Sequence, residues 1–268
     1  MKNRILIIAL IIILGAIAIY LIFFNGSNES KENKSEKTET VEITNLYNDD
    51  ENIEWSNVEG YDINLDGSIK ITEGGVYTLT GTISDGLILV DTEDEVKLIL
   101  DNVSITSSNT PAILVENAKL VEIELKEGSE NYLEDGSSYI SEYADYEGVI
   151  YSKDDLIISG TGKLTVKANL GDAIVSKDNL KIIDGNYVIS AADDAIKGKD
   201  SLYILNGEFN IMSSGDGLKS TNEEDENLGY IYIVNGTFDI TSGDDGIQAT
   251  TNLIIENGTF NIETSGSS

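Results

Sequence analysis

The second half of this chain repeats one pattern at a nearly fixed spacing, and this restricts its fold more than any other feature. Clear copies begin with DAIVSKDNLKI, DAIKGKDSLYI, DGLKS and DGIQA, and looser copies begin near Gly86, Ala112 and Gly148. The steps between the clear copies are 22, 22 and 29 residues, and the longest step is a 22-residue unit with a seven-residue insertion at 222–228. Fixed periods of this length predict a solenoid. The clear copies start at Asp172, Asp194, Asp216 and Asp245.

Each repeat is built from short β-rich segments rather than from helices. In the second copy these are Ala195–Lys197, Ser201–Leu205 and Glu208–Met212, separated by Gly, Asn, Asp and Ser. None is long enough for a helix, and apolar residues alternate with polar ones as they do in strands. Superimposed copies place like residues in columns, which are Tyr187, Phe209, Phe238 and Phe260; Ile189, Ile211, Ile240 and Ile262; and the corners Asp184-Gly185, Asn206-Gly207, Asn235-Gly236 and Asn257-Gly258.

These columns predict the fold class. Like residues stacked about 4.8 Å apart, coil upon coil, are typical of a parallel β-helix. We expect an all-β, right-handed parallel β-helix of about 22-residue coils, with an N-terminal transmembrane or signal helix. A β-sandwich is the alternative; it explains the short strands but not the columns.

The N-terminal part differs from the repeats in composition. Residues 5–24 form an uncharged apolar run preceded by Lys2 and Arg4, which predicts a membrane anchor with a cytoplasmic N-terminus, or else a signal sequence. Residues 25–45 are polar and highly charged, and we interpret them as a disordered linker. The β-helix is expected over 46–268, on the extracellular face of the membrane or secreted.

Composition excludes several classes of chemistry. The chain has no Cys and no His, and Arg4 is its only arginine, so it has no thiol nucleophile and no imidazole base. With 48 acidic and 17 basic residues the net charge is -31, which argues against nucleic acid as a partner and favours cations or neutral glycans.

Acidic residues recur at the corner where each clear copy begins. Carboxylates stacked one coil apart repel one another, and Ca²⁺ relieves such repulsion by taking 6–8 hard oxygen ligands. Asp-Gly pairs also make good turns, which is the simpler explanation for any one corner. We predict calcium at this column, with the candidate ligands Asp172, Asp193, Asp194, Asp216, Asp244 and Asp245.

Lysines and tyrosines near these corners are candidate sugar contacts. Lys197 and Lys219 each follow an acidic corner by three residues. Either lysine serves as a general base on a uronate if its pKa is depressed, or as a hydrogen-bond donor to sugar if it is not. Tyr139, Tyr143 and Tyr146 lie in a loop-like stretch and offer rings for sugar stacking, or they pack that loop onto the coils.

The repeats also resemble a known family. The runs GVIYSKDDL, DAIVSKDNLKI, GDGLKS and GYIYIVNGTFDITSGDDGIQA are similar to those of clostridial carbohydrate-binding domain-containing proteins, from about Asn52 to the C-terminus. The resemblance implies a secreted, pectate-lyase-like β-helix that binds cellulose-like or acidic, pectin-like polysaccharide with calcium between coils. It implies ligand roles for Asp193, Asp194, Asp216, Asp244 and Asp245, and for Asp172. Two departures are the stop at Ser268, which leaves an open last coil for a possible protein partner, and the missing lipoprotein cysteine.

Three functions therefore remain open. The leading one is calcium-stabilised, non-catalytic binding of polysaccharide at the cell surface, with residues 5–24 in the membrane. The enzymatic alternative is calcium-dependent β-elimination with Lys197 or Lys219 as base. The third is a structural stalk without affinity for sugar.

Overall fold

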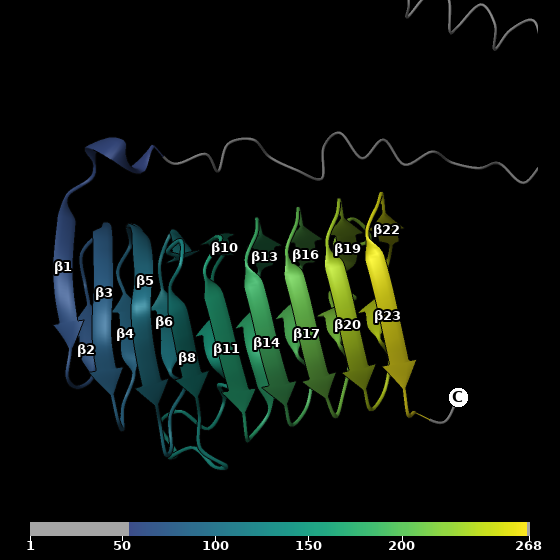
Figure 1. Cartoon of the computed structure of the whole chain (residues 1–268), viewed down its shortest axis with the longest axis horizontal. Helices are drawn as coiled ribbons and strands as arrows, with labels where there is room; N and C mark the ends of the chain where they lie inside the picture. The colour runs from purple at the N-terminus through teal and green to yellow at the C-terminus, as the bar shows by residue number, and fades with distance from the viewer. Residues whose placement is uncertain (1–53, 267–268) are drawn as a thin grey trace, which may run out of the picture. The chain divides into compact units, whose positions relative to one another are not determined.

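Successive coils of this molecule stack in register. A computed structural model describes residues 54–266. Every strand pair in this part of the chain is parallel, and the strands run up the solenoid in chain order (Figure 1). Residues from Glu54 onward form one compact unit. The all-β solenoid expected from the repeats is confirmed, because the parallel ladders join each copy to the next.

The coils present three faces. The first face is an eight-stranded sheet, and the second and third faces are the two branches of a 15-stranded sheet. The first face contains β2 (Ile69–Ile71), β4 (Ile88–Asp91), β6 (Ile113–Asn117), β9 (Gly148–Ser152), β12 (Asp172–Ser176), β15 (Ile196–Gly198), β18 (Leu218–Ser220) and β21 (Ile247–Ala249). The second contains β7 (Leu120–Leu125), β10 (Leu156–Gly160), β13 (Asn179–Ile182), β16 (Ser201–Ile204), β19 (Tyr230–Ile233) and β22 (Leu253–Ile255). The third contains β8 (Glu130–Glu134), β11 (Lys163–Ala168), β14 (Asn186–Ala191), β17 (Glu208–Ser213), β20 (Thr237–Ser242) and β23 (Thr259–Thr264).

A long strand joins the second and third faces at the N-terminal end. β5 (Glu95–Thr106) pairs with β7 through its first half and with β8 through its second half. Between the halves Asn102 has a φ of 57°, in the left-handed region that bends the chain. Before β5 come the short 3-10 helix η3 (Trp55–Asn57), β1 (Gly60–Leu65) and β3 (Gly75–Ile83). β1 pairs with β3, and β3 pairs with β5.

The predicted ring and isoleucine columns lie in the core except at the last coil, where Phe260 is half-buried and Ile262 is exposed. Tyr187, Phe209, Phe238 and Phe260 are direct register partners, and so are the four isoleucines two positions further along. The aromatic rings lie 4.7–4.8 Å apart with interplanar angles of 1–4°. Offset parallel stacking at this distance is favourable in addition to the burial of the rings. The seven-residue insertion falls between β18 and β19, outside the ladder.

The last coil leaves apolar side chains uncovered. Leu253 and Ile255 of β22 and Ile262 of β23 are exposed, whereas their register partners one coil earlier are buried. The possible protein partner at this coil stays a prediction.

One part of the predicted fold class is wrong. It included an N-terminal transmembrane or signal helix, but no helix within residues 54–266 is long and apolar enough to cross a membrane. A spanning helix needs about 20 residues, and the only helix in that range, η3, has three. Residues 5–24 and the linker at 25–45 lie outside the described residues, so the fold class is corrected to an all-β solenoid.

The aromatic stack generates the first prediction. Phe209→Ala removes a ring that is 3% exposed and lies between two others, so we expect a loss of about 3–5 kcal/mol in the free energy of unfolding. Met212→Ala on the same strand is the matched control, because Met212 is 62% exposed and its change should stay within about 0.5 kcal/mol. Urea unfolding followed by circular dichroism measures both, and equal losses would contradict the stack's role.

Candidate functional site

The repeating aspartates form a hydrogen-bonded column along the first face. Asp172 Oδ1 accepts a hydrogen bond from the backbone N–H of Asp194 at 2.9 Å, and Asp194 Oδ1 accepts one from the N–H of Asp216 at 2.8 Å. Asp216 Oδ1 does the same for the N–H of Asp245 at 2.8 Å. The first three side chains are buried, so each carboxylate binds the next coil through a charge-assisted bond.

Lysine ammonium groups lie between these carboxylates. Lys197 Nζ is 2.9 Å from Asp172 Oδ2 and 3.2 Å from Asp194 Oδ2. Lys219, its register partner on the next coil, is 3.0 Å from Asp194 Oδ2 and 2.6 Å from Asp216 Oδ2. Acid and base therefore alternate up the column, and both lysines bind neighbouring coils together. The sequence pointed to these lysines as sugar contacts, and the structure places them in contact with the aspartates.

The column shifts the pKa values of its members. Burial lowers the pKa of Lys197, but Asp172 and Asp194 outweigh it, and the net pKa lies above the ordinary value. The pKa of Lys219 is likewise raised, because Asp216 and Asp194 outweigh burial. Burial raises the pKa of Asp172 to about 6 in spite of Lys197. For Asp194, burial acts upward, but the Asp216 N–H and the two lysines hold the pKa below its usual range.

Glutamine replaces lysine on the next coil. Gln248 is the register partner of Lys219, and its Nε2 lies 3.3 Å from Asp245 Oδ2. A neutral amide cannot offset the added carboxylates, so the column gains negative charge without a matching cation at this end. Asp216 Oδ2 is buried, and its partner is the Lys219 ammonium group 2.6 Å away.

The six aspartates predicted as metal ligands come together in two groups of three. In each group one oxygen per residue lies within 4.8 Å of the others; the groups are Asp172, Asp193 and Asp194, and Asp216, Asp244 and Asp245. Lys197 bridges two members of the first group and so supplies its positive charge internally. The second group has Lys219 at Asp216, shared with Asp194 of the first group, and only the neutral Gln248 beside Asp245. Hard carboxylate oxygens in this number suit a divalent cation, and the second group fits one better.

The tyrosine loop lies between β8 and β9. The Tyr139 hydroxyl donates to Asp135 Oδ2 at 2.7 Å, and the Tyr146 hydroxyl donates to Glu116 Oε2 at 2.6 Å. Tyr143 and Tyr146 pack on a small cluster of Leu114, Tyr151 and Val175 on the outer side of the first face. All three loop tyrosines are partly exposed, so they fasten the loop to the coils and leave only part of each ring to solvent.

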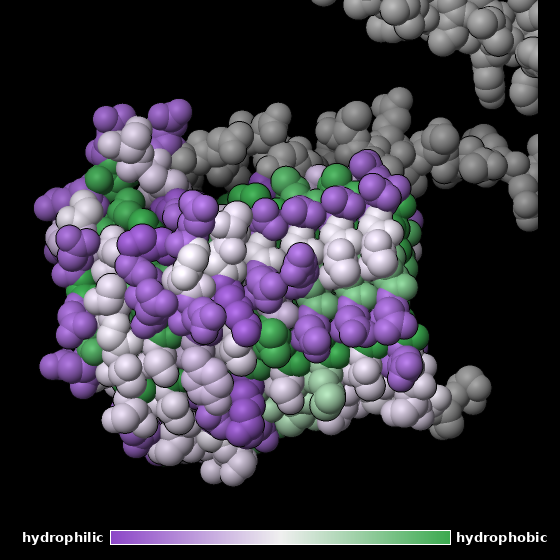
Figure 2. All heavy atoms as spheres, viewed as in Figure 1, coloured by the Kyte–Doolittle hydropathy of each residue, from purple (hydrophilic) through white to green (hydrophobic). Residues whose placement is uncertain are grey.

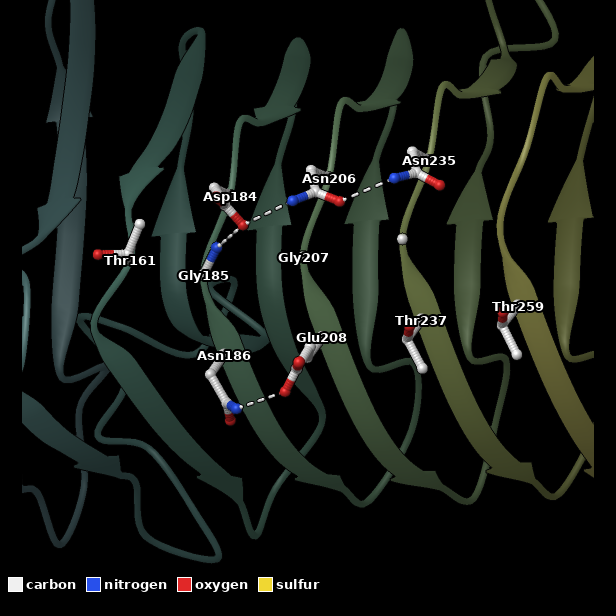
Figure 3. Close-up of a pocket in the computed structure, with 11 residues that line it drawn as sticks. Thr161, Asp184, Gly185, Asn186, Asn206, Gly207, Glu208, Asn235, Thr237 and Thr259 are labelled. Carbon is white, nitrogen blue, oxygen red and sulfur yellow. Dashed lines mark hydrogen bonds between the residues drawn. The ribbon is translucent and has the colours of Figure 1, made fainter.

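A polar groove at the corner before the third face was missed in the sequence. Its volume is about 440 Å³, and the Asp-Gly and Asn-Gly corners of successive coils line it (Figure 3). The sequence signal was present in these repeated pairs, but it was interpreted only as a turn. The rows of side chains on both sides of the corner glycines make the surface there concave.

This chain is similar to known proteins of one family. A family model described as carbohydrate-binding domain-containing protein matches residues 65–268, which is most of the chain. The chain belongs to this family. A protein of the same description from Acetivibrio thermocellus is 39% identical over 150 residues, which is 53% of this chain and 51% of that protein. The chain thus spans about half the length of that relative.

A solved structure shares the fold. It is a polysaccharide lyase-like protein from C. thermocellum, studied as a gadolinium derivative, with a TM-score of 0.66 and 33% identity. The match covers 78% of this chain and 94% of that one. The resemblance found in the sequence is therefore confirmed.

The lysine column generates the second prediction. Lys197→Met leaves the buried Asp172 without its cation and Asp194 with Lys219 alone, so we expect a loss of about 3–5 kcal/mol in unfolding free energy at neutral pH. Without the lysine the pKa of Asp172 rises further above its unfolded value. The folded state then binds more protons than the unfolded state, so the variant's stability falls as pH rises from 5 to 8.

Lys119→Met is the control for this change. Lys119 pairs with Glu95 on the surface with its side chain 70% exposed, so its replacement should cost less than about 1 kcal/mol and show no added pH dependence. Urea unfolding at several pH values measures both variants. A Lys197→Met loss no larger than that of the control would show that the column needs no ammonium group.

Proposed function

We propose that this protein is a non-catalytic, calcium-stabilised polysaccharide-binding module that works outside the cell. Family membership and the lyase-like relative support the ligand class. The observation that carries the non-catalytic part is the arrangement of Lys197 and Lys219, each held between buried carboxylates. The net charge of -31 suits a setting where calcium is plentiful, as it is outside the cell.

The lysines are poor bases in this arrangement. A general base must offer a free lone pair near the working pH. Both lysines have pKa values above normal, so their amines stay protonated. β-Elimination from a uronate would need one of them to lose its proton and leave its carboxylate partners. The chain also has no histidine, and its one arginine is Arg4, so neither an imidazole nor a guanidine in the repeats can take over from these lysines as base.

The third prediction concerns this chemistry. Incubation of the full chain with polygalacturonate and calcium should give no rise in the ultraviolet absorbance of unsaturated uronates from pH 6 to 10. Lys197→Gln and Lys219→Gln should give the same flat trace. A time-dependent rise that either variant abolishes would establish a lyase instead.

Calcium is proposed at the group of Asp216, Asp244 and Asp245. The support is the clustering of these three carboxylates within 4.8 Å and the neutral Gln248 at the register position that Lys197 and Lys219 occupy on the two preceding coils. The related structure is a gadolinium derivative, and lanthanides prefer the same hard oxygen ligands as calcium. Bound there, the cation would offset the carboxylates of two successive coils and stabilise the C-terminal end.

The fourth prediction tests this cation. Calcium at about 100 times its dissociation constant adds roughly 2.7 kcal/mol, so EGTA should lower the Tm by about 5–10 °C. Asp245→Asn should remove most of that EGTA response. Asp239→Asn on β20 is the control, since Asp239 is exposed and lies outside both aspartate groups. An unchanged Tm after chelation would contradict the proposal.

Affinity electrophoresis tests binding itself. The full chain is run through gels that contain either uncharged or acidic soluble polysaccharides, with bovine serum albumin as a reference. Slower migration in at least one gel supports the module. Unchanged migration in every gel would favour a structural stalk.

A further inference from the structure

The groove at the glycine corner has two polar rims and a bare floor. One rim is the row Asp184, Asn206 and Asn235, and the other follows the first residues of the third-face strands from Asn186 (Figure 3). The corner glycines lie between the rims. Rows of like residues run across the C-terminal coils on this side of the molecule (Figure 2).

The floor is bare because no side chain fits there. Gly207 has a φ of 140°, which side chains rarely adopt, and an added Cβ would lie 2.8 Å from the Phe209 ring. Gly185 and Gly236 are placed in the same way over Tyr187 and Phe238. The aromatic stack beneath thus keeps the groove open across three coils, and the rings themselves are buried and offer no stacking surface.

The first rim keeps spare hydrogen-bonding groups. Asn206 Nδ2 donates to Asp184 Oδ1 at 3.2 Å, and Asn235 Nδ2 donates to Asn206 Oδ1 at 3.3 Å (Figure 3). A primary amide has two donor hydrogens and an oxygen with two lone pairs, so this ladder uses only part of each side chain. The remainder repeats once per coil.

The second rim adds hydroxyl, amide and carboxylate groups in register. Asn186, Glu208, Thr237 and Thr259 are consecutive partners along the third face. Neighbouring coils lie about 4.8 Å apart, so this row is about 14 Å long. A pyranose in an extended glycan advances by a similar distance, so its hydroxyls meet the same groups coil after coil.

Charge decides which glycan suits this surface. The lining contains the carboxylates of Asp184 and Glu208 and neither lysine nor arginine. A uronate would be repelled, whereas hydroxyl groups donate to the carboxylates and exchange hydrogen bonds with the amides. We propose that this groove binds an extended, uncharged glycan at a site separate from the aspartate groups. The inference rests on the proposed function and names its site and ligand charge.

A paired substitution tests the site in the full chain. Asn206→Ala with Thr237→Ala removes one polar group from each rim, and Asn210→Ala with Thr241→Ala removes the same groups from exposed positions outside the groove on β17 and β20. Titration with cellohexaose in EGTA should show affinity at least about tenfold weaker for the groove pair and within twofold for the control pair. Trigalacturonate under the same conditions should bind more weakly than cellohexaose.

A second measurement does not depend on the variants folding. Cellohexaose added to ¹⁵N-labelled wild type should shift the side-chain amide signals of Asn186, Asn206 and Asn235 and leave that of Asn261 in place. Unmoved groove amides, or equal losses in both variant pairs, would overturn the groove while polysaccharide binding in gels still stood. Absence of binding to every glycan would instead remove the proposed function and the groove together.

Discussion

In-register stacking of successive coils is the constraint on which this structure depends. A parallel ladder places each side chain directly over its counterpart one coil away, about 4.8 Å distant. Each residue type in the repeat therefore recurs as a column along the coils. The interaction between like side chains in that column is favourable for some residue types and unfavourable for others. Rings gain from this arrangement, as the stack through Phe209 and Phe238 shows. Carboxylates lose from it, because like charges at coil spacing repel.

The aspartate column shows how the chain answers that repulsion. One oxygen of each carboxylate accepts the next coil's backbone N–H, and the other faces a lysine. The same lysines that resemble catalytic bases in the sequence thus act as structural counter-ions. Both lysines have pKa values above the ordinary value because of these carboxylates, so the contacts that hold the coils together also keep the two amines protonated. Gln248 takes the position of the next lysine, so the alternation of carboxylate and ammonium groups ends there. The carboxylates at that end of the column therefore have no matching cation of their own.

The features that depend only on the repeat period could be predicted from the sequence. The ring and isoleucine columns and the glycine corners recur with the repeat, so their neighbours in space follow from their neighbours in register. The gathering of Asp172 with Asp194, and of Asp216 with Asp245, followed in the same way. The direction of a long side chain does not follow from period, because Lys197 can reach solvent or its own corner from the same backbone position. The groove was missed for a similar reason, since concavity arises from the rows on both sides of a turn.

The glycine corner has a consequence for how such a surface changes over time. Because rings lie directly beneath Gly185, Gly207 and Gly236, the floor tolerates no new side chain, and variation is confined to the rims. The rims themselves are extended one coil at a time. Duplication or deletion of a repeat would lengthen or shorten the groove by one coil without altering its chemistry. The length of the groove therefore depends on the number of coils and not on changes within a coil.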